Sequence, residues 1–265
     1  MPAHPASGPS PIESIRLIER FERSETGFKY QATSLPGHLI HLVVSGVVEQ
    51  TCNGRQQKLR PGSIVWYHED EWVEGRVIKA PWIYYSVNFT APTLAPPDFN
   101  ARLIDHRDDL QTLFIDLHTA WQLSPSRERD YRCQAHLLEL LAALNPGGVG
   151  QALVTPNGRL WWEVETWARQ RIDEAVTLGN LCTQFHRSAN TLTRACMDAV
   201  GTTPMKRLKQ IRLSLARGLV HYSDLTMTEI ALRVGYARVH EFSRDYRKAH
   251  GFPPSRDRLS NRLKP

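Results

Sequence analysis

The sequence predicts an α+β multidomain fold, with an N-terminal β-barrel and following helices, and then a C-terminal all-α domain. Residues 12–91 contain short runs rich in Val, Ile, Tyr and Trp, separated by turn residues, which is typical of strands. From residue 105 onwards, apolar residues recur at the three- and four-residue spacing of helices. The chain of 265 residues is long enough for two such domains.

The distribution of charge also separates two parts of the chain. Residues 155–265 contain 19 basic and 10 acidic side chains, whereas residues 1–154 contain 14 basic and 17 acidic ones. The net charge of +6 therefore comes entirely from the C-terminal part. This asymmetry indicates that the C-terminal part meets a polyanion and that the N-terminal part has another role.

Composition excludes several classes of protein. Hydrophobic residues make up 41% and charged residues 23%, so a wholly disordered or fibrous chain is excluded. There is no apolar run of 18 residues, so no membrane partner is expected. Residues 1–11 lack the apolar segment of a signal peptide and are expected to form a flexible arm. Four widely spaced cysteines predict a cytoplasmic protein without disulfides or zinc fingers: Cys52, Cys133, Cys182 and Cys196. No cofactor or bound metal is expected.

The β domain is expected to cover residues 12–104. Strands are predicted at 39–44, 47–52, 63–67, 74–78 and 82–89. Asn53-Gly54 is a hairpin signal, and Pro61-Gly62 marks a second turn. Several short strands at this spacing predict a sandwich or barrel.

Residues 105–150 are expected to form two helices that pack on the β domain and offer a face for dimerisation. Pro125 separates the two apolar stripes, and Asn145-Pro-Gly-Gly ends the second. The stripes serve equally well as core, which is their commoner role. Residues 151–158 are predicted to be a linker to the basic region at 159–265.

Within the basic region, a short helix, a tight turn and a second helix occur twice, at 177–200 and at 226–250. Thr177 and Ser188 are predicted N-caps, Thr226 and Glu229 form a capping-box pattern, and a helix at 204–222 connects the two units. In a helix-turn-helix unit the second helix enters a major groove, and two units reach groove segments about 34 Å apart. The alternative is an ordinary helical bundle with solvated charges.

Helix phase selects the side chains that would contact DNA. In the first unit, base contacts are predicted for Asn190, Thr193 and Arg194. In the second unit, they are predicted for Val239, His240, Glu241 and Arg244. Arg pairs with guanine, Asn with adenine, Glu with cytosine, and Val lies on a thymine methyl group. Ser188 and Arg238 are predicted to contact phosphate. The alternative for each is a surface residue that never reaches a base, and for Arg244 also a contact with the DNA backbone.

The segment at 235–258 resembles the signature of the AraC/XylS family of transcription regulators, which has G-F, then F-S-R-x-F-K, G-x-x-P and a final Arg. Residues 229–231 match its E-I-A, and Arg212, Ala216 and Leu219 match its R-x-x-x-A-x-x-L helix. Leu181, Ser188 and Leu192 match the more variable first unit. Three positions depart from the pattern: Cys182 replaces Ala, Cys196 replaces Phe, and Asp257 replaces an aromatic residue. The resemblance covers residues 160–258 and implies a non-enzymatic, sequence-specific regulator, an activator or a repressor, that binds double-stranded DNA, with RNA polymerase as a further partner.

Residues 35–46, 53–54 and 59–65 are similar to the cupin barrel that often precedes this DNA-binding domain. That similarity implies a cupin-like β domain that binds a small-molecule effector and supports a homodimer. Aromatic and polar strand residues are predicted to line the effector pocket and to suit a small ligand with polar and apolar parts, sugar-like ligands included: His41, Trp66, His68, Trp72, Trp82, Tyr84 and Asn88. The alternative is that the rings fill the barrel core; strand alternation prevents Tyr84 and Tyr85 from both pointing inward.

Two other hypotheses remain for the β domain. Gly62 is followed by His68, Asp70 and Glu74 at the spacing of metal-binding cupins, which favours a metal-dependent cupin enzyme fused to a DNA-binding domain. Residues 69–71 are equally typical of a hydrophilic, acidic turn. The second hypothesis is a DNA-binding regulator whose β domain only forms oligomers.

Overall fold

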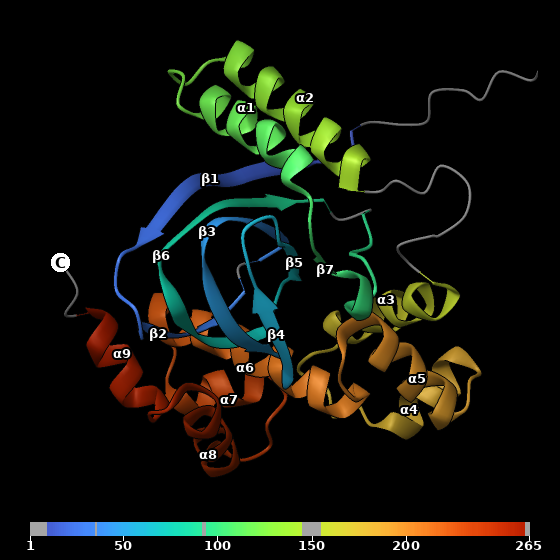
Figure 1. Cartoon of the computed structure of the whole chain (residues 1–265). Coiled ribbons are helices and arrows are strands. Elements are labelled where there is room, and N and C mark those ends of the chain that lie inside the picture. The colour runs from blue at the N-terminus through green and yellow to red at the C-terminus, as the bar shows by residue number, and fades with distance from the viewer. Residues whose placement is uncertain (1–9, 35, 92–93, 145–154, 263–265) are drawn as a thin grey trace, which may run out of the picture. The chain divides into compact units, whose positions relative to one another are not determined.

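The computed structural model describes residues 10–34, 36–91, 94–144 and 155–262. The chain divides into two compact units, Met1–Val154 and Thr155–Pro265 (Figure 1). The first unit contains an antiparallel sheet followed by helices, and the described part of the second unit is helical throughout. The predicted α+β multidomain fold class is thus confirmed. Residues 1–9 of the predicted arm, and residues 145–154, lie outside the described residues.

The sheet has seven strands in the order β1-β6-β3-β5-β7, with β2 paired to β6 and β4 paired to β3. The long strands β3 and β6 pair with each other along most of their length and form its centre. Figure 1 shows that the sheet curls around itself. The bounds are β1 Ser14–Arg23, β2 Lys29–Thr33, β3 His38–Cys52, β4 Arg55–Leu59, β5 Ile64–His68, β6 Trp72–Thr90 and β7 Leu103–Ile104.

The structure joins four of the predicted strands into two. The predicted strands 39–44 and 47–52 both belong to β3, and 74–78 and 82–89 both belong to β6. The predicted breaks near Gly46 and Pro81 lie on facing segments of β3 and β6, because Ser45 pairs with Ile83 and Val47 with Lys79 across irregular register. Gly46 has φ +85°, and a Cβ there would lie 2.6 Å from the carbonyl oxygen of Pro81. Gly46 and Pro81 therefore mark a shared bulge that bends the sheet without ending either strand.

Alternation along the strands sorts the apolar side chains onto two faces. Ile40, Leu42 and Val87 belong to a cluster that packs against helices α1 (Gln111–Trp121) and α2 (Arg127–Leu144). Leu39, Val43 and Tyr84 belong to a second cluster on the opposite face of the sheet. We call this second side the inner face. Two short 3-10 turns, η1 (Phe99–Ala101) and η2 (Asp108–Leu110), connect the sheet to α1.

The C-terminal unit contains both predicted helix-turn-helix units, α4–α5 and α7–α8, and the long α6 packs into both of their cores. The structure corrects one expectation and adds one helix that was not predicted. The linker ends before residue 158, because α3 begins at Pro156 with Thr155 as its N-cap. A further helix, α9, follows Pro253. The bounds are α3 Pro156–Arg169, α4 Leu178–Phe185, α5 Ala189–Val200, α6 Pro204–Tyr222, α7 Met227–Arg233, α8 Val239–His250 and α9 Pro254–Arg262. None of the helices in the described ranges is long and apolar enough to cross a membrane.

Candidate functional sites

The first helix-turn-helix unit is set by local hydrogen bonds. Thr177 and Asn180 form a capping box that starts α4. His186 ends α4 in the left-handed region with φ 49°, which turns the chain sharply. The Ser188 hydroxyl then accepts a hydrogen bond from the Thr191 backbone N–H at 3.2 Å and starts α5. Ser188, predicted to contact phosphate, thus has a capping role in the free protein.

One face of α5 is exposed. Asn190 and Arg194 lie one turn apart on it, with Thr193 half-buried beside them. The opposite face packs Leu192 and Cys196 into the core. The structure therefore brings the three predicted base-contacting residues of this unit onto one face. Met197, which is 45% exposed, extends that face by a further turn and was not predicted.

In the second unit, α8 buries Phe242, Tyr246 and His250 and exposes the other side of the helix. His240, Glu241 and Arg244 lie on the exposed side, as predicted. Arg238, the N-cap residue, is exposed and makes no capping hydrogen bond with its side chain.

Three features of α8 differ from the prediction. Val239 is half-buried and packs against the core, which restricts its side chain for the predicted contact with a thymine methyl group. Arg247 and Lys248 are exposed and extend the basic face. Arg247 lies three residues after Arg244 and Lys248 lies four residues after it, so helical spacing was the signal that could have identified them.

The turn of the second unit depends on a close backbone approach. Gly235 has φ +79°, and a Cβ there would lie 2.4 Å from the carbonyl oxygen of Ile172. Arg212 of α6 donates to that same carbonyl at 3.2 Å and to the Glu174 carbonyl at 2.6 Å. A side chain at position 235 would therefore displace the α3–α4 connection that Arg212 holds.

Each helix-turn-helix core contains a buried carboxylate. Glu165 of α3 accepts hydrogen bonds from Arg207 at 2.8 and 2.9 Å and from the Trp161 indole at 3.0 Å. Oε1 of the same carboxylate also accepts from Arg169 at 2.7 Å. These contacts join α3 to α6 through a side chain that is itself almost wholly buried.

In the second core, Asp257 of α9 accepts a hydrogen bond from the Tyr246 hydroxyl at 2.6 Å. It also lies 2.9 Å from His221 Nε2 and 3.3 Å from Arg217 Nε. Burial raises the pKa of Asp257, but the hydrogen bonds from Tyr246 and His221 outweigh it and hold the pKa below its usual value. The aspartate that replaces an aromatic residue of the family signature is thus a buried link between α6, α8 and α9.

The inner face of the sheet contains a cavity of about 300 Å³. His41, Trp82 and Tyr84, three of the seven predicted effector-binding residues, line it. The rings of Trp82 and Tyr84 stack with centroids 4.3 Å apart, and the His41 ring lies 4.9 Å from Tyr84. Burial lowers the pKa of His41 to about 3, so its imidazole is neutral at physiological pH.

The other four predicted residues do not line this cavity. Trp66 faces α1 and α2, where its indole N–H donates to His38 Nδ1 at 3.2 Å, and the His68 ring lies 4.9 Å from the His38 ring. Trp72 precedes the inward-facing Val73 and so lies on the outer face. The Asn88 amide donates to the Pro36 and His38 carbonyls. Tyr85 points toward α1, away from Tyr84, as alternation predicts.

Several cavity residues were missed because they lie on β1, on β2 or in the turn between them, where no strand had been assigned. Arg23 lines the cavity and lies opposite Trp82 across the β1–β6 ladder. Tyr30 of β2 stacks on Trp82 with centroids 5.3 Å apart. The alternation of charged and apolar residues in 14–23 was the available signal.

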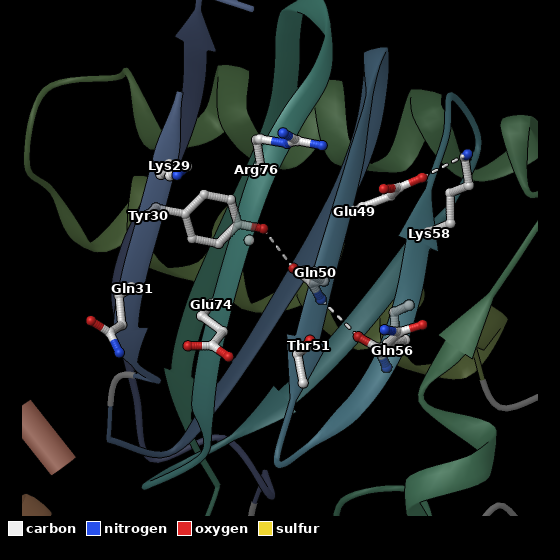
Figure 2. Close-up of a pocket in the computed structure, with 12 residues that line it drawn as sticks. Lys29, Tyr30, Gln31, Glu49, Gln50, Thr51, Gln56, Lys58, Glu74 and Arg76 are labelled. Carbon is white, nitrogen blue, oxygen red and sulfur yellow. Dashed lines mark hydrogen bonds and ion pairs between the residues drawn. The ribbon is translucent and has the colours of Figure 1, made fainter. Parts of the chain in front are cut away.

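A larger, shallow groove of about 860 Å³ lies on the outer face of strands β2, β6, β3 and β4 (Figure 2). Register places Lys29, Arg76, Glu49 and Lys58 in one row across these strands, and Lys58 donates to Glu49 at 2.9 Å. The lining side chains of this groove are mostly exposed and polar. A small molecule is held better by the smaller, aromatic cavity of the inner face.

The structure does not assemble the residues of the metal-enzyme hypothesis. Glu74 is exposed on the outer face, and Asp70 occupies a turn with φ 63°. Within the described residues, no group of three or more His, Cys, Asp and Glu side chains is placed to hold a metal ion. The expected acidic turn also contains Glu71, which is buried and forms an ion pair with the buried Arg102.

Comparison with known protein families gives a match in each of the two units. Residues 17–141 match an AraC-like ligand binding domain, and residues 181–260 match a helix-turn-helix domain. The HTH-type transcriptional activator RhaS of Escherichia fergusonii is 31% identical over 117 residues, which are 44% of this chain and 42% of RhaS. The chain thus spans less than half the length of the curated relatives it matches.

Solved structures of ToxT from Vibrio cholerae share the fold across both units. One is 13% identical with a TM-score of 0.61, covering 93% of this chain and 98% of ToxT. A second, bound to an unsaturated fatty acid, is 11% identical with a TM-score of 0.59, covering 94% of this chain and 96% of ToxT. With a ligand-binding domain followed by a helix-turn-helix domain of the same type, the chain belongs to the AraC family of transcription regulators.

Proposed function

We propose that the protein is a sequence-specific DNA-binding regulator of transcription that responds to a small molecule held in the inner cavity of its β domain. The observation that supports this function best is the pair of exposed faces on α5 and α8, both connected to α6 within the basic part of the chain. Two such helices suit two successive major-groove segments of one duplex. The surplus of Lys and Arg suits the phosphate backbone.

Base recognition is assigned to the two exposed faces. Arg194 and Arg244 would bind guanine through O6 and N7, Asn190 would bind adenine, and Glu241 would accept from cytosine N4. Arg238, together with Arg247 and Lys248, would contact phosphates and set the register of the protein on DNA. The residues are exposed and reachable without repacking either core.

The experiment is a binding titration of the full-length protein on an operator found by genome-wide mapping of its binding sites. Arg194→Ala or Arg244→Ala should each weaken operator binding by about 1–3 kcal/mol. Arg132→Ala is the matched control, because Arg132 is an exposed arginine on α2. Operator affinity that is unchanged in both Arg194→Ala and Arg244→Ala would contradict the assignment.

The same proposal includes a homodimer in the cytoplasm, where the chromosome lies. It also includes activation of transcription, which the name of the RhaS relatives suggests, through recruitment of RNA polymerase. Support for the dimer comes from α2, where Tyr131, Ala135 and Leu138 form an exposed apolar stripe at helical spacing. Tyr131 is 68% exposed. Such a stripe is costly in water and suits a second copy of the same helix. The proposal requires no catalytic step.

A further inference from the structure

The chemistry of the inner cavity narrows the class of effector. Among the described residues that line the cavity there is no Asp or Glu. Most of the other polar groups are occupied: Tyr30 and Tyr67 both donate to Gln50 Oε1, at 2.8 and 3.0 Å, and the Gln50 amide donates to Gln57 at 2.7 Å. The cavity therefore has little capacity to accept hydrogen bonds from a ligand.

Donors, in contrast, remain available. The Trp82 indole N–H is buried and has no hydrogen-bond partner among the described residues. Burying a donor without an acceptor costs free energy, and a hydrogen-bond acceptor on a ligand would remove that cost. The neutral imidazole of His41 can also donate one hydrogen bond.

Arg23 supplies a positive charge at the edge of the cavity. It is exposed, lines the cavity, and is held by aromatic rings rather than by a carboxylate, with its guanidinium carbon 5.9 Å from the centre of Phe21 and 5.7 Å from that of Phe28. Within the described part of the chain no ion pair involves Arg23. A carboxylate can therefore bind the guanidinium without displacing another acid.

The walls between these polar groups are flat and apolar. Tyr84, Trp82 and Tyr30 line the cavity and stack in a row with centroid separations of 4.3 and 5.3 Å, and Phe21 continues the row beyond the lining, 5.4 Å from Tyr84. Leu39 and Val73 add aliphatic side chains to the lining. Such a surface favours a planar or aliphatic body, because apolar area gains most from leaving water.

We propose that the effector is a small organic acid with an apolar, preferably planar, body, whose carboxylate binds Arg23 while its body lies against Tyr30, Trp82 and Tyr84. This inference rests on the proposed function, since it names the ligand class of the same cavity. It replaces the sugar-like effector predicted from the sequence. A sugar presents a ring of hydroxyl donors, for which the described lining offers few free acceptors. A cationic ligand would meet Arg23 with no carboxylate to balance it.

The test is calorimetric titration of the full-length protein with benzoate, phenylacetate, trans-cinnamate and octanoate, with the amides of the same acids, and with D-glucose. At least one acid should bind more tightly than its amide and than glucose. Arg23→Gln should weaken binding of that acid about tenfold or more and leave amide binding within about twofold. Arg20→Gln is the matched control, because Arg20 lies on the same strand but on its other face.

Occupancy of the cavity is tested by Ala32→Phe. Ala32 lines the cavity from an exposed position, so a larger side chain there should block it while the protein still folds. Loss of acid binding in Ala32→Phe, with an unchanged melting temperature, would support the assignment. Acid binding that survives Ala32→Phe would overturn it.

The remaining outcomes separate this inference from the proposed function. If an acid and its amide bind equally, and Arg23→Gln changes neither affinity, the assignment of an organic acid as effector is overturned. The cavity would still be an effector site. Tight binding of glucose, with no binding of the acids, would also overturn the assignment of an organic acid as effector. Failure of all four acids to bind would overturn it as well, whereas the operator titration above would still decide whether the protein recognises DNA.

Discussion

The two helix-turn-helix halves have the same architecture but differ in what holds them together and in what they present. In the first half, the buried carboxylate of Glu165 is paired with two arginines. In the second half, Asp257 is bound by a tyrosine, a histidine and an arginine, and His250 is buried nearby. The carboxylate of the first core is therefore bound by two arginines and an indole, whereas that of the second is bound by three side chains of different chemistry.

The exposed faces differ in a parallel way. The recognition helix α5 has one basic residue, Arg194, beside Asn190, Thr193 and Met197, whereas α8 exposes Arg244, Arg247 and Lys248. Phosphate contact makes binding sensitive to salt, and base contact makes it sensitive to sequence. Under the proposed function, α5 would contribute chiefly sequence discrimination and α8 would contribute more of the phosphate affinity.

The largest expected effect is on the first core. Glu165→Ala leaves the buried Arg207 without its acid, and loss of one partner of a buried pair costs about 3–5 kcal/mol of unfolding free energy. Chemical denaturation of the full chain measures this change. Glu163→Ala, an exposed position on the same helix, should change the unfolding free energy by about 0.5 kcal/mol or less. Equal stability of the two variants would refute the structural role of Glu165.

A smaller effect, specific to the second half, is expected on acidification. Burial lowers the pKa of His250 to about 4, from 6.5 in the unfolded chain. Between these values the unfolded state binds the proton and the folded state does not, so stability is full above pH 6.5 and falls as the pH drops towards 4. The loss approaches about 1.4 kcal/mol per pH unit.

Hydrogen exchange resolves this pH effect by helix. After correction for intrinsic exchange rates, amide protection in α8 should decrease between pH 7 and pH 5 by about 2 kcal/mol, and protection in α5 should decrease less. His250→Asn should flatten the pH dependence of α8. A parallel decrease in both helices that persists in His250→Asn would contradict the comparison between the two halves.

The smallest expected effect concerns salt. Lys248→Gln should reduce the slope of log K against log salt concentration by about 0.9, with a nearly uniform loss of affinity for operator and unrelated DNA. Arg132→Gln on α2 should leave the slope unchanged. Operator titrations at several salt concentrations measure both variants. A slope unaltered in Lys248→Gln would show that Lys248 does not contact phosphate.

Local signals predicted the helical unit well, because its boundaries depend on neighbours in sequence. The caps at Thr177, Ser188 and Thr226 each bond to a residue three positions away, and all three begin helices where expected. The exposed faces of α5 and α8 follow from the same spacing. Missing α9 reflects its weak apolar pattern, since Asp257 and Arg258 bond instead to distant groups on α6 and α8.

The β unit was predicted less well, because strand register depends on residues far apart in the chain. The predicted breaks near Gly46 and Pro81 disappear only when the two strands are paired. Trp66 and His68 were assigned to the wrong face, since alternation alone does not say which face carries the helices. Glu71 in an acidic turn is buried only because Arg102 lies beside it. The cavity could be placed in this unit from sequence, whereas its lining required the register.

Bipartite recognition of one duplex is the central claim, and the most direct measurement is the base preference of the wild-type protein and of Arg194→Ala and Arg244→Ala across a randomised operator. Each variant should lose discrimination at one short segment, and the two segments should lie about one helical turn, roughly 10 bp, apart. Loss of discrimination at the same base pairs in both variants, or at none, would contradict the claim.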